Sequence, residues 1–196
     1  LATRLNLPER EVRTVAALLK EHGLVSLDAA GMCVTPDAEK ILPAARRFSR
    51  ELRGLTGLET ALSGKLGVSK VYVAPGDYDQ DSHVLHEVAR IAASRLRSFL
   101  QSGSTLAVTG GSTIHEVALA LNQSTPMNVM VVPARGGMGR SLETQANTVA
   151  SEIAKRLGGH HRFMHLPDHL DEQALTELKK LREVTETLDL LQRADV

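Results

Sequence analysis

The stretch AVTGGSTIHEVALAL, residues 107–121, decides the fold because it changes from a strand pattern to a helix pattern across two glycines. Its first residues are apolar, and its last residues follow a helical spacing. Gly110 and Gly111 lack a Cβ, so the backbone can turn sharply and approach a ligand. Ser112 and Thr113 can cap the helix and donate hydroxyl hydrogen bonds. Backbone amides at such a helix start suit a phosphate.

This turn differs from the common nucleotide-binding motifs. It lacks the spacing and the lysine of GxxxxGK[ST], and it lacks the spacing of GxGxxG. A strand-to-helix turn built only for packing would also favour glycine and serine. The turn by itself therefore leaves phosphate binding and packing as two open interpretations.

A second strand end has the same character. In VVPARGGMGR, residues 131–140, Arg135 follows a β-branched run and precedes two glycines. A guanidinium at this place can make a forked contact with a phosphate. Gln145 and Asn147, in the first turns of the next expected helix, can bond sugar hydroxyls or phosphate oxygens, or can simply cap and pack. The two strand ends together indicate a small phosphorylated sugar.

Strand and helix patterns alternate around these turns. We expect strands at 71–74, 105–109, 129–132 and 162–166, and helices at 82–100, 114–121 and 143–157. This order predicts an α/β fold with a parallel sheet covered by helices on both faces. Ligands of such folds bind beyond the carboxyl ends of the strands, where the glycine turns lie.

The first 35 residues predict a separate small unit. A short helix is followed by a second helix that begins after Pro8 and ends near Gly23, and two β-prone pieces then form a hairpin. A hairpin directly after a second helix is typical of a winged helix-turn-helix. An ordinary helical hairpin with a charged face is the alternative. Side chains suited to base edges and phosphates lie on the solvent side of the second helix: Arg10, Arg13, Thr14 and Lys20.

Residues 37–66 predict a charged connecting helix that could also pair two subunits. Gly54 and Gly57 weaken the helical pattern, so we expect a break there.

The composition favours a globular cytoplasmic protein. The 196 residues are 42% hydrophobic, and 23 basic residues balance 23 acidic ones, so any basic face must be local. A lone Cys33 cannot form an internal disulfide, and no apolar run approaches the ~18 residues of a membrane span. Because the chain does not start with Met and stops on Asp195-Val196 as a strand would begin, we expect a piece cut at both ends.

Neither group of candidate metal ligands fits a metal. Asp77, Asp79 and Asp81 alternate like a calcium loop, but Ser82 and Val88 stand where that loop needs glycine and glutamate. We instead expect Asp81 or Ser82 to cap a helix. Four histidines near an expected strand lack a second ligand group in register for zinc: His160, His161, His165 and His169.

A catalytic site would need a general base beside the sugar. The candidates are His115, Glu116 and Glu143. His115 lies one turn inside its expected helix, where packing or exposure is commoner, and Glu143 lacks a partner acid. We therefore expect a binding protein with no catalytic residue and no cofactor. A sugar-phosphate isomerase or deaminase is the alternative.

The order of helix pair, hairpin, PGDYDQD, VTGGST, VPARGGMG and E-x-Q-A-N-T resembles the sugar-responsive bacterial transcriptional regulators of the sorbitol-operon (SorC) type, especially those of central glycolytic genes. The resemblance covers essentially the whole chain, and the pairing of PARGG with ETQANT is its specific part. It implies a winged helix-turn-helix at 1–35, a connecting helix at 36–66 and a sugar-phosphate effector domain at 67–196. That domain would have the Rossmann-like fold of glucosamine-phosphate deaminases and ribose-phosphate isomerases without their catalysis.

The resemblance also implies the partners. The effector would be fructose-1,6-bisphosphate or a related phosphosugar, and its phosphate would be held by Gly110, Gly111, Ser112, Thr113, Arg135 and Gln145. Operator DNA would be contacted by Arg10, Arg13 and Thr14, with Arg4 or Lys20 on its phosphate backbone. Symmetric operators call for a homo-oligomer, a dimer or a tetramer. The family's first helix would precede Leu1, and further strands would complete the effector site.

Overall fold

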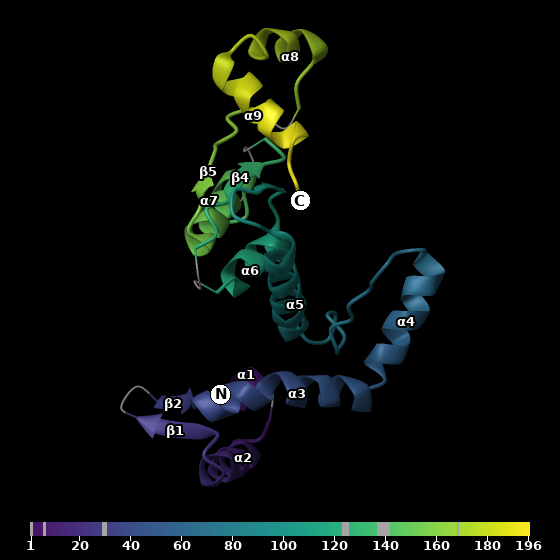
Figure 1. Cartoon of the computed structure of the whole chain (residues 1–196), viewed down its shortest axis with the longest axis vertical. Helices are drawn as coiled ribbons and strands as arrows, with labels where there is room; N and C mark the ends of the chain where they lie inside the picture. The colour runs from purple at the N-terminus through teal and green to yellow at the C-terminus, as the bar shows by residue number, and fades with distance from the viewer. Residues whose placement is uncertain (1, 6, 29–30, 123–125, 137–141, 168) are drawn as a thin grey trace. The chain divides into compact units, whose positions relative to one another are not determined.

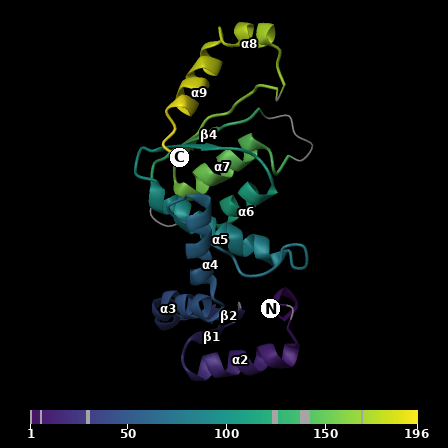
Figure 2. The same ribbon diagram turned by 90° about the vertical axis from the view of Figure 1, so that its right-hand side faces the viewer.

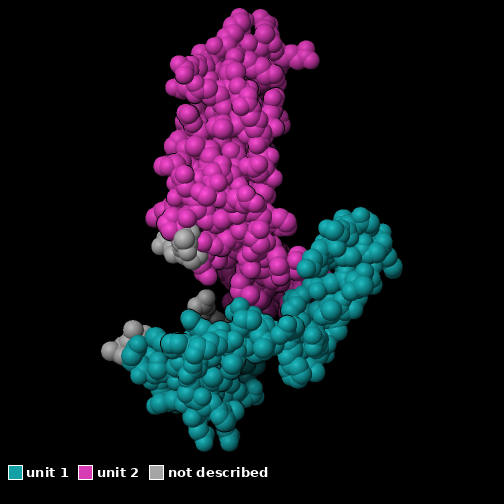
Figure 3. Space-filling view, viewed as in Figure 1, with its two compact units in different colours: residues 1–71 teal, residues 72–196 magenta. Residues whose placement is uncertain are grey.

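The computed structural model describes residues 2–5, 7–28, 31–122, 126–136, 142–167 and 169–196. The chain divides into two compact units, Leu1–Val71 and Tyr72–Val196, which Figure 3 shows in two colours. Each unit is described by itself.

The N-terminal unit begins with two helices and a hairpin, as expected. Helices α1 (Ala2–Leu5) and α2 (Glu9–Glu21) precede strands β1 (Val25–Asp28) and β2 (Gly31–Val34), which pair antiparallel. Pro8 stands directly before α2, and Gly23, with a φ of +68°, lets the chain leave it. The Thr35 hydroxyl donates to the Gly23 carbonyl at 2.7 Å, which ties the end of the hairpin to the end of α2.

Two further helices complete this unit. Helix α3 (Pro36–Leu52) is capped by Thr35, whose side-chain oxygen accepts from the Ala38 amide at 3.3 Å, and α4 (Leu55–Leu66) follows. The expected break is confirmed at Gly54, which has a φ of +67°, whereas Gly57 lies inside α4. An ion pair between Arg50 and Glu59 joins α3 to α4.

The C-terminal unit is built on a parallel sheet, as expected. Strands β3 (Thr105–Val108), β4 (Met130–Pro133) and β5 (His160–His161) lie in the order β3-β4-β5 (Figure 1). The register pairs Val108 with Pro133 and Met130 with His160. The strands of this sheet therefore finish at one common edge.

The C-terminal unit also contains helices. They are α5 (His83–Phe99), α6 (Ser112–Ala120), α7 (Ala146–Leu157), α8 (Glu172–Leu178) and α9 (Arg182–Gln192). Helix α6 lies between α5 and α7 (Figures 1 and 2), α7 packs on β4 and β5, and α9 packs on β3 and β4. Val131, Val149, Ile153 and Leu157 are fully buried at the centre of this unit. The expected helices at 82–100, 114–121 and 143–157 thus correspond to α5, α6 and α7.

The strand expected at 71–74 is wrong, because the structure gives those residues no strand conformation. The end of the chain takes the free edge of β3 instead. The Asp195 amide donates to the Thr105 carbonyl at 2.9 Å, and the Ala107 amide donates to the Val196 carbonyl at 2.8 Å. A strand-like composition alone therefore did not predict a strand here.

The strand expected at 162–166 is also wrong, since β5 ends at His161. The Arg162 amide still donates to the Val131 carbonyl at 3.0 Å. The next donor along β4 in this parallel register would be residue 133, which is a proline without an N–H group. The ladder consequently stops, although the chain continues alongside.

Candidate functional site

Two strand ends meet at one edge of the sheet. The Ala134 amide donates to the Val108 carbonyl at 2.7 Å, which continues the pairing with β3 one residue past the end of β4. Gly110 lies two residues beyond β3, and Arg135 lies two residues beyond β4. The structure therefore brings the glycine turn and the backbone of Arg135 to the same edge.

The glycine turn is fixed against the residues that precede α7. Gly111, with a φ of +119°, precedes α6, and its amide donates to the Thr144 carbonyl at 2.8 Å. A Cβ added to Gly110 would lie 2.3 Å from the same carbonyl oxygen. The Gly110 backbone and the Gly111 amide therefore hold the turn against the residues before α7. The amides of the exposed Ser112 and Thr113 begin α6, where helix geometry leaves them without an intrahelical acceptor.

Gln145 stands next to this turn. It precedes α7 with φ −68° and ψ 145°, and its carbonyl accepts from the Val149 amide at 2.9 Å. Its carbonyl carbon would lie 3.2 Å from a Cβ at Gly110. The backbones of Gly110 and Gln145 are therefore in direct contact, and the half-buried Gln145 side chain starts from this point.

The end of β4 packs on the segment that follows β5. A Cβ at Gly136 would lie 2.2 Å from the Leu166 carbonyl oxygen and 2.9 Å from the Pro167 carbonyl carbon. Only a glycine fits this approach. Gly137, the second glycine of the expected loop, lies outside the described residues.

Of the two interpretations for Asn147, sugar contact and packing, its hydrogen bonds support packing. Its Nδ2 donates to the Met164 carbonyl at 3.0 Å, and its Oδ1 accepts from the Met164 amide at 2.9 Å. Both polar groups of the Asn147 side chain are therefore engaged by one residue of the main chain. No spacing in the sequence signals this pair, because the two residues meet only through the packing of α7 on the sheet.

Two of the three catalytic candidates lie in one groove, and the third makes a separate ion pair. His115 and Glu143 line one groove of about 410 Å³, whose other lining residues are Leu119, Asn147, Thr148, Ser151, Glu152 and Phe163. The buried Nδ1 of His115 has no hydrogen-bond partner among the described residues. Glu116 instead pairs with His86 at 2.8 Å and joins α6 to α5.

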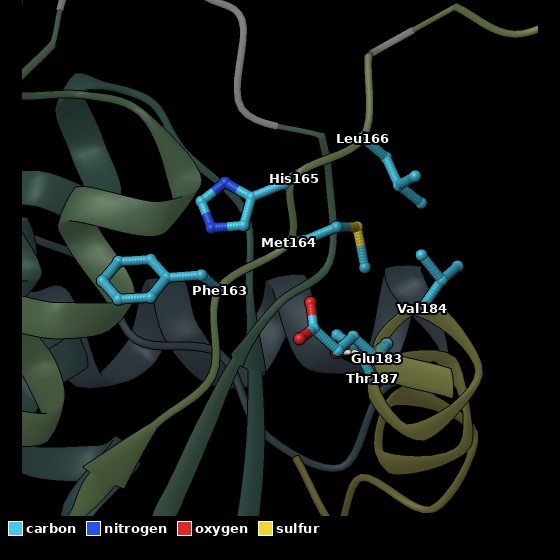
Figure 4. Close-up of a pocket in the computed structure, with 7 residues that line it drawn as sticks. All are labelled: Phe163, Met164, His165, Leu166, Glu183, Val184 and Thr187. Carbon is cyan, nitrogen blue, oxygen red and sulfur yellow. Dashed lines mark hydrogen bonds between the residues drawn. The ribbon is translucent and has the colours of Figure 1, made fainter. Parts of the chain in front are cut away.

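A smaller cavity of about 40 Å³ lies between residues 163–166 and α9. Figure 4 shows how the side chains alternate: Phe163 and His165 point to the side of α7, whereas Met164 and Leu166 point to α9. The volume admits water rather than a sugar. This cavity is therefore a packing gap.

The DNA-contact candidates share one helix face. Arg10, Arg13, Thr14 and Lys20 are exposed on α2 at helical spacing. The Arg13 guanidinium donates from Nη2 to Glu9 Oε1 at 2.6 Å, and the Thr14 hydroxyl donates to the Arg10 carbonyl at 2.9 Å. Arg4 belongs to α1, and its side chain lies outside the described residues.

The aspartate turn before α5 caps that helix. Asp81 Oδ1 accepts from the His83 amide at 2.9 Å, and Asp77 Oδ1 accepts from the Asp79 amide at 3.0 Å. The expected capping by Asp81 is confirmed, and Ser82 makes no side-chain cap. Within the described ranges, no three His, Cys, Asp or Glu side chains are placed to share a metal ion. The described helices also include none that could cross a membrane.

Residues 50–196 match the family model described as "Putative sugar-binding domain". The chain is 34% identical to the central glycolytic genes regulator of Priestia megaterium, over 99% of this chain and 57% of that protein. It is 30% identical to the same regulator of Bacillus subtilis, over 100% of this chain and 58% of that protein. The chain thus spans little more than half the length of these relatives.

One solved structure covers nearly the whole chain. The full-length sorbitol operon regulator of Klebsiella pneumoniae superposes with a TM-score of 0.63 at 18% identity, over 96% of this chain and 56% of that one. This likeness concerns the fold.

Proposed function

Because the chain belongs to the sugar-binding domain family and is related to regulators of the sorbitol-operon type, we propose that it is part of a cytoplasmic transcriptional repressor. A phosphorylated sugar, fructose-1,6-bisphosphate or a close relative, controls its binding to operator DNA. The protein binds this sugar and does not convert it.

The proposal of an effector site rests on one observation. The ends of β3 and β4 lie side by side, so the first amides of α6 and the backbone of Arg135 share one edge of the sheet. Helix-start amides and a guanidinium are complementary to a phosphate dianion. In this proposal Ser112 and Thr113 bind a phosphate through their amides and hydroxyls, and Arg135 and Gln145 complete the site. Gly110 and Gly111 allow the turn to form.

The DNA-binding proposal rests on the N-terminal unit. The order α1, α2, hairpin is that of a winged helix-turn-helix, with α2 as the recognition helix. Its exposed arginines and Thr14 suit base edges, and Lys20 suits the DNA backbone. The overall charge is balanced, so this local face supplies the attraction.

The oligomer proposal rests on α3. Its Ile41, Phe48 and Leu52 lie on one helix face and are 48%, 62% and 72% exposed. Acidic residues begin α3 and arginines dominate its second half. Two copies of α3 packed antiparallel would bury these apolar groups and bring opposite charges together. A dimer built this way matches the two-fold symmetry of an operator.

The test is binding by the full-length protein. We expect fructose-1,6-bisphosphate to raise the melting temperature and change the gel shift of operator fragments selected from random double-stranded DNA. Fructose and inorganic phosphate serve as controls and should act weakly. Arg135→Ala should remove the sugar response and leave DNA binding intact. Absence of selected DNA, or of any response across a panel of phosphosugars, would refute the proposal.

The competing function is a sugar-phosphate isomerase or deaminase, and one observation favours it: His115 and Glu143 line the same groove. Turnover of glucosamine 6-phosphate or ribose 5-phosphate, lost in Glu143→Gln, would establish that function. No turnover by the wild type at high enzyme concentration would exclude it for these substrates.

A further inference from the structure

One side-chain amide takes the place of a strand partner at the edge of the proposed sugar site. Asn147, in the first turn of α7, exchanges two hydrogen bonds with the main chain of Met164, at 3.0 Å and 2.9 Å. This is the pairing that a neighbouring β-strand would provide. Met164 is 7% exposed, so water is a poor substitute for these bonds.

Met164 needs such a partner because the ladder has already ended. In the parallel register the missing amide of Pro133 would face the Arg162 carbonyl, so the ladder stops two residues before Met164. Without Asn147, the amide and carbonyl of a buried residue would lose their partners. The side chain therefore holds residues 162–166 along the sheet where strand pairing fails.

The segment held in this way supports the end of β4. Leu166 and Pro167, two and three residues after Met164, contact Gly136 so closely that a Cβ there would lie 2.2 Å from the Leu166 oxygen. Gly136 follows Arg135 directly. The position of the Arg135 backbone thus depends on where the segment after β5 lies.

The same part of α7 also holds the glycine turn. The Thr144 carbonyl, three residues before Asn147, accepts from the Gly111 amide at 2.8 Å. The start of α7 is therefore in contact with the strand ends that carry both proposed phosphate-binding elements, directly for one and through residues 164–167 for the other.

We propose that Asn147 is a positioning residue for phosphosugar binding, an inference that rests on the proposed function. It does not touch the sugar. It fixes residues 164–167, which in turn fix Gly136 and Arg135 in the distance range at which the guanidinium and the α6 amides bind one phosphate together.

Arg156 provides a matched control on the same helix. Its Nη1 donates to the carbonyls of Leu119 and Leu121 at 2.8 Å and 3.1 Å. It thus also bonds main-chain groups of another segment, but nine residues further along α7, about 13 Å away. Arg156→Ala should lower stability without disturbing the strand ends.

The experiment titrates fructose-1,6-bisphosphate into full-length wild type, Asn147→Ala, Asn147→Asp and Arg156→Ala, and records each melting temperature. We expect both Asn147 variants to weaken binding by about tenfold or more. Asp keeps an acceptor for the Met164 amide, but it cannot donate to the Met164 carbonyl and sets a carboxylate oxygen against it. Arg156→Ala should stay within about twofold of wild type.

Hydrogen exchange of the Met164 amide gives a readout that needs no ligand, and we expect faster exchange in Asn147→Ala than in Arg156→Ala. Wild-type affinity in both Asn147 variants would overturn the inference. The inference would also be overturned if Arg156→Ala weakened sugar binding as much as the Asn147 variants do, at an equal loss of melting temperature. A wild type that binds no phosphosugar would instead refute the proposed function, and it would be seen before any variant is made.

Discussion

The two units differ in where they keep their apolar side chains. In the C-terminal unit Val131, Ile153 and Leu157 are completely buried between sheet and helices. In the N-terminal unit the buried hydrophobic side chains among the described residues are Ala38 and Leu55. An amphipathic sequence is common to both units, but a core forms only where a second apolar layer faces the first.

Helix α2 shows what this difference means. Its apolar spacing is strongly helical, yet Val15 and Leu18 remain 54% and 53% exposed. The unit is held largely by local devices, such as the Thr35 tie to Gly23 and the ion pair of α3 with α4. Its free apolar faces are therefore the natural sites for association, whereas the C-terminal unit has its own core.

The largest difference between the units should appear when one apolar side chain is truncated in each. Ile153→Ala should destabilise the C-terminal unit by roughly 3–4 kcal/mol, because it leaves a cavity in a closed core. Leu18→Ala should cost less than about 1 kcal/mol, since half of that side chain already faces water. Urea unfolding followed by circular dichroism measures both. Equal costs would show that α2 is covered in solution.

Glycine-to-alanine substitutions should change stability in opposite directions in the two units. Gly110→Ala should destabilise by about 1–3 kcal/mol, because the new Cβ meets a backbone oxygen at 2.3 Å. Gly57→Ala, in the open middle of α4, should stabilise by roughly 0.5–1 kcal/mol. Thermal unfolding checks the two signs. A neutral Gly110→Ala would mean that the residues before α7 can move aside.

Substitutions in the N-terminal unit should affect DNA binding and leave sugar binding unchanged. Arg13→Ala should weaken binding to selected operator DNA by about 1–3 kcal/mol if the guanidinium contacts a base edge, and it should leave sugar binding unchanged. Arg10→Ala is the paired variant on the same face. Fluorescence anisotropy at two salt concentrations distinguishes base contact from phosphate contact. An unchanged affinity in Arg13→Ala would remove this residue from the recognition surface.

The smallest effect concerns an exposed ion pair in α9. The hydrogen bond from Arg182, together with its charge, holds the pKa of Glu186 below its ordinary value. A lowered pKa in the folded state stabilises above the ordinary glutamate pKa, and the gain is lost as pH falls through the folded pKa. Arg182→Ala should therefore change the melting temperature slightly near neutral pH and not at all in strong acid. A large change at neutral pH would contradict an exposed pair.

The sequence predicted the elements better than their partners. Apolar periodicity located α2, α5, α6 and α7, and Gly54 marked the break between α3 and α4. The two wrong strands, at 71–74 and 162–166, have strand-like composition. Asp195 and Val196 lie along β3, and β5 stops at His161 before the expected strand at 162–166, where β4 lacks a donor at Pro133.

The amino-acid sequence by itself determined the alternation of strands and helices, the turns at Gly54 and Gly110, and the motifs that relate the chain to sugar-binding regulators. These are local properties, set by side-chain spacing and backbone freedom within a few residues. Tertiary structure alone decided that Gly111 bonds Thr144 and that Asn147 pairs with Met164. Such contacts join distant segments, and they follow from strand register and helix packing, which no short stretch of sequence encodes.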